Sequence, residues 1–215
     1  MRESQSVRPG RRQRALRAAF HLLYRFGGRG YDTLVQALFG SSWDEWRAAT
    51  VAGLDAEPVL DLGCGTGVLL ARMRRQGIDA LGIDREPSML AATRRRGARP
   101  LVRAEARALP LRSSSIGGCV ATFPAPFILE RAVLDEVARV LRPGGRFVVL
   151  LGGLPARPSS VPVRFLLRVV YGDRPDIPLP GQSLLCHELL PGAWRRIESP
   201  AGPAVVWMSR RRASD

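Results

Sequence analysis

Lysine and asparagine are absent from this 215-residue chain, so all 33 of its basic residues are arginine. Against 19 acidic residues they give a formal net charge of +14. Exclusive use of arginine is typical of a GC-rich genome, which makes the charge weak evidence for a nucleic-acid partner. A strongly basic chain is nevertheless attracted to anionic surfaces, whether of nucleic acid, acidic lipid or an acidic protein.

Long apolar runs and paired cysteines are also missing. No uninterrupted apolar run approaches the roughly 20 residues that span a membrane, and the N-terminus lacks the apolar core and cleavage site of a secretory signal. Three cysteines without metal-ligand spacing provide neither a disulfide nor a zinc framework. We therefore expect a cytoplasmic protein without a bound metal, and the length fits one domain with a substantial core.

The most informative segment is Val59–Gly67, VLDLGCGTG, in which an apolar run ends in closely spaced glycines. Its first four residues predict a buried parallel strand, and Val68–Arg75 predicts a helix that Gly77 ends. Glycines between a strand and a helix let the backbone turn sharply and approach a ligand. A dinucleotide fingerprint would need its third small residue where Val68 stands, whereas the third glycine here is Gly67.

This segment resembles motif I of the class I S-adenosylmethionine-dependent methyltransferases, in particular the type 11, quinone-biosynthesis-like branch that acts on small molecules. The resemblance is carried by Asp61, Gly63, Gly65 and Gly67, and it implies that these residues bind the cofactor. A strand-turn-helix of this kind can also be purely structural.

Asp84 follows the next predicted strand, and the resemblance implies that it holds both ribose hydroxyls of S-adenosylmethionine. A carboxylate suits this role because it accepts two hydrogen bonds from a vicinal diol, each strengthened by its charge. Alternatively, Asp84 only caps a helix that begins near Pro87.

The segment Ala104–Leu111, AEARALPL, is similar to the family's Gly-Asp-Ala-Glu-x-Leu-Pro-Phe segment. The resemblance implies that Glu105, which replaces an aspartate, accepts a hydrogen bond from the adenine amino group, and that the backbone N–H of Ala106 faces an adenine ring nitrogen. It further implies cofactor contacts from Arg85 and Thr122. The alternative for Glu105 is an ion pair with a surrounding arginine on a solvated loop.

Apolar periodicity predicts the elements that complete a sheet. These elements are strands over 79–83, 100–103, 118–122, 146–151, 195–199 and 205–209, and helices over 130–141 and 182–190. The turn Arg142-Pro143-Gly144-Gly145 is a further hallmark of the family. The expected fold is therefore α/β, a Rossmann-like seven-stranded mostly parallel sheet with helices on both faces, an antiparallel C-terminal strand and a helical N-terminal lid.

Residues 1–57 are expected to form a basic arm and a helical lid of the same domain, whose methyltransferase part is 58–215. The arm and an amphipathic stretch over 18–26 suit peripheral contact with an anionic membrane, the alternative being a helix packed over the active site. Tyr31 and Asp32 open a segment similar to the lid of quinone-biosynthesis methyltransferases. The acceptor-facing candidates are Tyr24, Tyr31, Trp43 and Phe123, each of which could instead be core. A helix over 161–171 is expected beside the substrate mouth.

Methyl transfer from an activated sulfonium mainly requires alignment and exclusion of water, with a base only where the nucleophile must lose a proton. His21 and His187 are the only histidines, and His187 is a weak candidate for a base or a structural residue. No Asn-Pro-Pro-Tyr-type tetrapeptide follows the fourth predicted strand, where Thr122-Phe123-Pro124-Ala125 stands. This favours O- or C-methylation of a small, hydrophobic acceptor.

Three other functions stay open on sequence alone. The same fold could methylate RNA or protein through the arginine-rich arm. A non-catalytic module could retain the cofactor pocket, which would fit the missing base and the Glu105 replacement. A dinucleotide oxidoreductase is disfavoured by Val68 and by the lack of a second catalytic domain.

Overall fold

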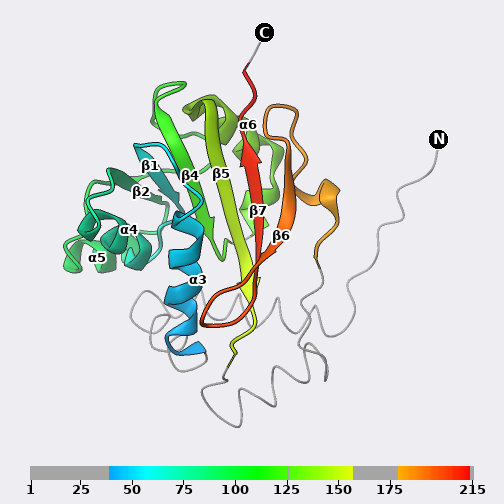
Figure 1. Cartoon of the computed structure of the whole chain (residues 1–215). Helices are drawn as coiled ribbons and strands as arrows, with labels where there is room; N and C mark the ends of the chain where they lie inside the picture. Colours follow the sequence, from blue (N-terminus) through cyan, green and yellow to red (C-terminus); the bar gives the residue numbers. More distant parts are fainter. Residues whose placement is uncertain (1–38, 125, 157–178, 214–215) are drawn as a thin grey trace.

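Seven strands pair in the order β3-β2-β1-β4-β5-β7-β6 in the computed structural model, which describes residues 39–124, 126–156 and 179–213 (Figure 1). The strands are β1 (Val59–Leu62), β2 (Ala80–Asp84), β3 (Leu101–Arg103), β4 (Ile116–Thr122), β5 (Leu141–Gly153), β6 (Gly192–Ile197) and β7 (Ala204–Arg210). β7 pairs antiparallel with both β5 and β6, and the other pairs are parallel. The predicted mostly parallel sheet with an antiparallel C-terminal strand is confirmed.

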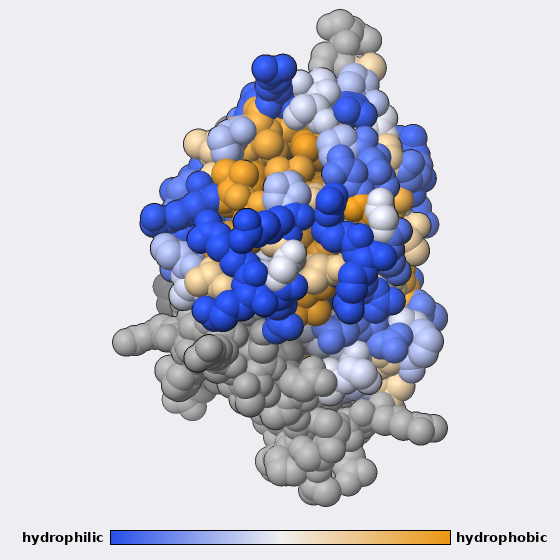
Figure 2. Space-filling model, turned by 90° about the vertical axis from the view of Figure 1, so that its left-hand side faces the viewer, coloured by the Kyte–Doolittle hydropathy of each residue, from blue (hydrophilic) through white to orange (hydrophobic). Residues whose placement is uncertain are grey.

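Helices cover both faces of this sheet (Figure 1). Those described are α3 (Ser42–Val51), α4 (Val68–Arg75), α5 (Pro87–Arg95) and α6 (Arg131–Val140), with the single 3-10 turns η1 (Pro126–Leu129) and η2 (Gln182–Leu185). Figure 2 shows the side on the left of Figure 1, where α4 and α5 lie, as a largely hydrophilic surface with hydrophobic areas between the hydrophilic side chains. Exposed arginines at the ends of both helices complement the helix dipoles: Arg72, Arg74, Arg75, Arg94 and Arg95.

Each central strand contributes side chains to two cores because successive residues point to opposite faces. Val59 of β1 packs in a cluster with Leu69 and Met73 of α4. Leu60 and Leu62 pack in the opposite cluster, which contains Val133 and Val137 of α6. Burial on both faces explains why β1 is a continuous apolar run interrupted only by Asp61.

The helix predicted over 182–190 is wrong beyond its first turn. Only Gln182–Leu185 is helical, as a 3-10 turn, and the backbone at Cys186 is extended. The His187 ring then accepts the Leu189 N–H at 3.1 Å, a local bond that replaces helical pairing. Leu185 and Leu190 are both buried in the core cluster of α6, so their apolar spacing reflects packing of an irregular segment.

The start of β5 also differs from the prediction. β5 begins at Leu141, which pairs with Ile116 of β4 before a bulge shifts the register to Gly118 and Arg146. The predicted turn over 142–145 is therefore part of an irregular strand. The helix predicted over 161–171 lies outside the described residues.

The indole of Trp46 joins α3 to the sheet. Trp46 is fully buried, and its Nε1 donates to the Gly202 carbonyl at 3.0 Å. A Cβ at Gly153 of β5 would collide with the atoms of this indole. A glycine at position 153 is thus required for α3 to lie this close to β5.

We expect Gly153→Ala to lower the free energy of unfolding by about 1–3 kcal/mol, because the added methyl group overpacks the Trp46 site. Urea denaturation measures the change. Gly152→Ala is the matched control, since nothing lies within 4 Å of a Cβ at that position. Equal stability of the two variants would contradict this account of α3 packing.

Candidate functional site

The turn between β1 and α4 depends on three glycines. Gly63, Gly65 and Gly67 have φ angles of +71°, +55° and +73°, a left-handed conformation that side chains disfavour. A Cβ at Gly67 would also collide with the Thr93 side chain. At Gly65 the nearest atom to a Cβ is the Gly63 carbonyl oxygen at 4.0 Å, so this side of the turn leaves its backbone open to a ligand.

Hydrogen bonds from β2 and α5 hold the turn in place. The Gly65 N–H donates to Asp84 Oδ2 at 2.8 Å, and the Thr93 hydroxyl donates to the Gly65 carbonyl at 2.8 Å. Arg96 Nε, just past α5, donates to the Thr66 carbonyl at 3.0 Å. The turn is therefore preorganised by groups far from it in sequence.

Asp84 lies at the carboxyl end of β2 and engages both the turn and its own loop. Its Oδ1 accepts the Glu86 N–H at 2.8 Å, while Glu86 stands as the N-cap of α5 without a side-chain cap bond. Burial raises the pKa of Asp84, and the N–H groups of Glu86 and Gly65 oppose the rise. Each carboxylate oxygen retains a lone pair for a further donor.

Asp61 is the second carboxyl group beside the turn, and it is 1% exposed. Its Oδ2 is fully buried without a hydrogen-bond partner in the described part of the chain. Burial raises the pKa of Asp61 to about 7, the Arg47 guanidinium opposes this, and the Asp84 carboxylate adds to it. An orphaned buried carboxyl oxygen is a feature that a bound cationic group would satisfy.

Two of the lid candidates meet across the carboxyl end of β4. Trp43 of α3 and Phe123, which follows β4, stack with ring centroids 3.4 Å apart at 12°. Phe123 has a φ of +49°, a conformation unusual for an aromatic residue and a sign of local strain. Phe39 extends the cluster, its ring centroid 4.9 Å from that of Trp43. Tyr24 and Tyr31, the other lid candidates, lie outside the described residues.

Arg47, which lies one turn after Trp43 on α3, could not be identified as a site residue from the sequence. Its Cζ lies 5.7 Å from the Trp43 ring centroid and 5.9 Å from that of Phe123, within cation–π range. In a chain whose basic residues are all arginine, only the three-dimensional structure distinguishes this one.

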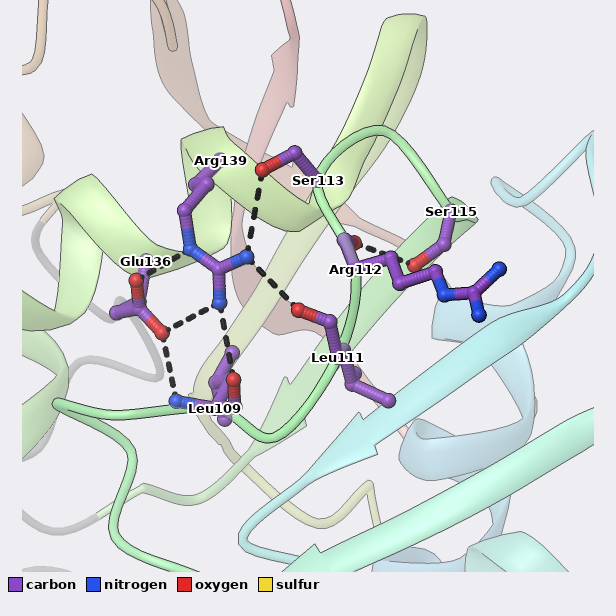
Figure 3. Close-up of polar contacts among 7 residues, drawn as sticks. All are labelled: Leu109, Leu111, Arg112, Ser113, Ser115, Glu136 and Arg139. Atoms are coloured by element: carbon purple, nitrogen blue, oxygen red, sulfur yellow. Dashed lines mark hydrogen bonds and ion pairs between the residues drawn. The ribbon is translucent and has the colours of Figure 1, made fainter.

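The loop after β3, which contains Glu105 and Ala106, is fixed from α6 (Figure 3). Glu136 Oε2 accepts the Leu109 N–H at 2.6 Å, and Arg139 donates to the Leu109 and Leu111 carbonyls at 2.9 and 2.8 Å. Arg139 and Glu136 also bond each other twice, at 2.6 and 2.8 Å. Glu136 and Arg139 thus hydrogen-bond to backbone atoms of the loop and hold it beside the ends of β1 and β2.

Glu105 itself is exposed, and no ion pair engages it within the described ranges. Its neighbour Arg107 instead pairs with Glu130, Nε to Oε2 at 2.6 Å. Arg85 is exposed and 3.3 Å from the Glu86 carboxylate, and Thr122 ends β4 half-buried. These positions leave Glu105 and Arg85 accessible to a ligand.

His187 is buried and engaged through both ring nitrogens. Its Nε2 lies 3.0 Å from Asp135 Oδ1 of α6, and its Nδ1 accepts the Leu189 N–H. The bonds from His187 and Arg131 lower the pKa of Asp135. Neither partner of His187 belongs to the turn or to the loops around it. Within residues 39–124, 126–156 and 179–213, no group of histidine, cysteine and acidic residues could hold a metal ion, and no helix is long and apolar enough to cross a membrane.

Comparison with known proteins gives one family match and a set of relatives. A family model described as a methyltransferase domain matches residues 60–149. The demethylmenaquinone methyltransferase of Corynebacterium kroppenstedtii is 34% identical over 149 residues, which cover 66% of this chain and 65% of that protein. The protein of that name from Clavibacter sepedonicus is 36% identical over 121 residues, covering 53% and 49%. The chain thus spans less than two thirds of the length of either relative.

Solved structures support the fold. An S-adenosylmethionine-dependent methyltransferase of Thermotoga maritima, a possible histamine N-methyltransferase, has a TM-score of 0.63 at 17% identity, over 89% of this chain and 99% of that one. The 1,6-didemethyltoxoflavin-N1-methyltransferase of Burkholderia thailandensis, solved with S-adenosylhomocysteine, has a TM-score of 0.54 at 18% identity, over 99% and 94%. At such identities the likeness shows the fold alone, and it confirms the Rossmann-like architecture.

The buried Asp61 carboxyl group predicts a pH dependence of stability. The pKa of Asp61 is about 7 in the folded chain against 3.8 for an exposed aspartate. The contribution of this group to the free energy of unfolding is therefore fully present below pH 3.8 and is lost as the pH rises through 7. We expect Asp61→Asn to remove a decline on the order of 2–4 kcal/mol between pH 4 and 8 in the ligand-free protein. Urea denaturation across this range tests it.

The matched control is Asp79→Asn, at an exposed carboxylate just before β2. This variant should keep the slope of the parent protein. If Asp61→Asn also kept that slope, the Asp61 carboxyl group would be ionised in the folded state at low pH, and its raised pKa would be wrong.

Proposed function

We propose that the chain is a class I S-adenosylmethionine-dependent methyltransferase, which transfers the methyl group of S-adenosylmethionine to a small hydrophobic acceptor by O- or C-methylation. We propose a reduced quinone ring as the acceptor class, the class that the names of the curated relatives indicate. The observation that carries the proposal is the pair of carboxyl groups, Asp61 and Asp84, flanking a glycine turn whose backbone is open at Gly65.

The residues around the turn fit the parts of the cofactor. Asp84 would accept the ribose hydroxyls, and Asp61 would accept the ammonium group of the methionine part, which satisfies its orphaned oxygen. Glu105 and the Ala106 N–H would meet the adenine ring. Further contacts are proposed from Gly63, Gly67, Arg85 and Thr122.

The aromatic cluster at the end of β4 supports a planar, apolar acceptor. Trp43 and Phe123 form a stacked pair that is almost fully buried, and Phe39 packs against it. Trp43 Nε1 is also buried without a partner in the described segments. We propose that this N–H donates to an oxygen of the acceptor, which a quinone-type ring carries.

Chemistry at this site needs little from the protein. The bound cofactor supplies a methyl group already activated by the sulfonium, so the chain's residues bind, orient and exclude water. We assign no base, because both ring nitrogens of His187 are engaged elsewhere. The N-terminal segment 1–57 is proposed as arm and lid of the domain 58–215, with peripheral contact to an anionic membrane through the arm.

Calorimetric titration with S-adenosylhomocysteine tests the cofactor site. We expect micromolar binding that Asp84→Ala weakens about 10- to 100-fold, since a charged hydrogen-bond acceptor to the ribose is lost. Asp79→Ala is the matched control, because it removes an exposed carboxylate just before β2. This variant should bind S-adenosylhomocysteine as the parent protein does. Unchanged binding by Asp84→Ala would refute the ribose assignment.

Mass spectrometry of the reaction products tests the acceptor. With S-adenosylmethionine present, we expect a demethylated naphthoquinol to gain one methyl group and RNA to gain none. Methylation of RNA that falls steeply with salt would favour the nucleic-acid alternative. Cofactor binding without methylation of any quinol, phenol, RNA or protein tested would favour the non-catalytic module.

A further inference from the structure

Two side chains of α6 hold the backbone of the loop after β3 (Figure 3). Glu136 accepts the Leu109 N–H at 2.6 Å, and Arg139 donates to the carbonyls of Leu109 and Leu111 at 2.9 and 2.8 Å. Because Glu136 and Arg139 also bond each other, a single ion pair holds three backbone groups of the loop. We call these two residues the α6 clamp.

The clamp differs from an ordinary ion pair on a helix surface, which contributes little. Its two side chains are only 18% and 35% exposed, Glu136 being the more buried. The planar fork of the Arg139 guanidinium allows it to reach the carboxylate and both carbonyls at once. Hydrogen bonds to charged groups are shorter and stronger than neutral ones, so the clamp fixes the backbone at Leu109 and Leu111 firmly.

The other end of the loop is joined to β2. The Ala104 N–H donates to the Asp84 carbonyl at 3.3 Å, so the loop begins at the residue whose side chain holds the glycine turn. Glu105 and Ala106, which are proposed to meet adenine, lie between this bond and the clamp. A bond from the Ala108 N–H to the Glu105 carbonyl at 3.0 Å closes the turn that they form. The position of this turn therefore depends on both of its ends.

We propose that the α6 clamp determines the base selectivity of the cofactor site, by holding Glu105 and the Ala106 N–H where they distinguish adenine from hypoxanthine. This inference rests on the proposed function and deepens it. Glu136 and Arg139 touch no ligand in it and act as positioning residues.

The two purine bases present opposite hydrogen-bonding groups at adjacent atoms. The amino group of adenine donates to a carboxylate, and the ring nitrogen beside it accepts from an N–H. Hypoxanthine has a carbonyl oxygen and an N–H at these two atoms, so the same pair of protein groups leaves its polar atoms unpaired. Selectivity of this kind requires that the protein acceptor and donor are both held in place.

Both protein groups depend on the backbone of the loop. The donor of Ala106 is itself a backbone group, so it moves with the loop. The Glu105 side chain is exposed and has more rotamers than a shorter aspartate, so its own packing fixes the carboxylate weakly. A shift of the loop would therefore affect both contacts at once, and the clamp is what opposes such a shift.

Two ligands that differ only in the base test this role. S-adenosylhomocysteine carries adenine, and S-inosylhomocysteine carries hypoxanthine on the same ribose and amino-acid group. Calorimetry on the full chain should show that the parent protein binds the adenine ligand about 30- to 100-fold more tightly. Arg139→Gln should lower this ratio about tenfold, mainly by weakening S-adenosylhomocysteine, because the fork that holds both carbonyls is lost.

Three further variants make the test specific. Arg139→Lys keeps the charge without the fork and should give an intermediate ratio. Glu136→Gln removes the charge of the other partner and should lower the ratio in the same direction as Arg139→Gln. Arg131→Gln is the matched control, because it breaks an ion pair of the same helix, with Asp135 at 2.9 Å, away from the loop. This variant should keep the ratio of the parent. Binding of S-inosylhomocysteine reports that each variant is folded around the rest of the site.

The possible failures are distinguishable. If the ratio in Arg139→Gln and Glu136→Gln stayed that of the parent, the clamp would only stabilise the fold and the inference would be overturned, while the cofactor assignment stood. If the parent bound the two ligands equally, the adenine contacts of Glu105 and Ala106 would be refuted and the inference with them. If the parent bound neither ligand, the proposed function itself would fail.

Discussion

The hydrogen bond from the Gly65 N–H to the Asp84 carboxylate is the constraint on which the site depends. It joins the ends of β1 and β2 at 2.8 Å and fixes the peptide of a turn whose glycines are all left-handed. The Thr93 bond to the Gly65 carbonyl holds the other side of the same residue. Because the backbone of this turn is fixed from both sides, a ligand can bind it without paying to order a loop. The same carboxylate that holds the turn is the one proposed to receive the ribose.

Placing two carboxyl groups beside this turn sets function against stability. Asp61 is buried near Asp84, and the repulsion adds to the burial that raises its pKa. A buried acid with an unsatisfied oxygen costs stability unless a cation reaches it. Arg47 relieves part of this cost through its charge, and the proposed ammonium of the cofactor would relieve the rest. The proposed ligand would therefore stabilise the folded protein.

Local signals predicted the parts of the fold whose residues determine their own conformation. β1, α4 and the Gly77 end of that helix were predicted because an apolar run, a glycine turn and a helical stripe follow one another. The helix over 182–190 failed because its apolar residues pack on α6 from an irregular segment that the His187 ring holds locally. The position of Arg47 could not be predicted, since nothing near it in sequence shows that Phe123 lies beside it.

The stack of Trp43 on Phe123 joins α3 to the end of β4, beside the glycine turn. Phe123 adopts a left-handed backbone conformation that is unfavourable for an aromatic residue. The stacking contact with Trp43 must therefore offset this cost in free energy. The contact gives an almost fully buried ring pair at the end of β4, which lies beside Arg47 of α3. Methyl transfer requires that water be kept from the acceptor and that the acceptor approach the sulfonium in line. The stacked rings at the end of β4, almost fully buried without any ligand, would serve the first of these requirements, because they exclude water from that side of the site.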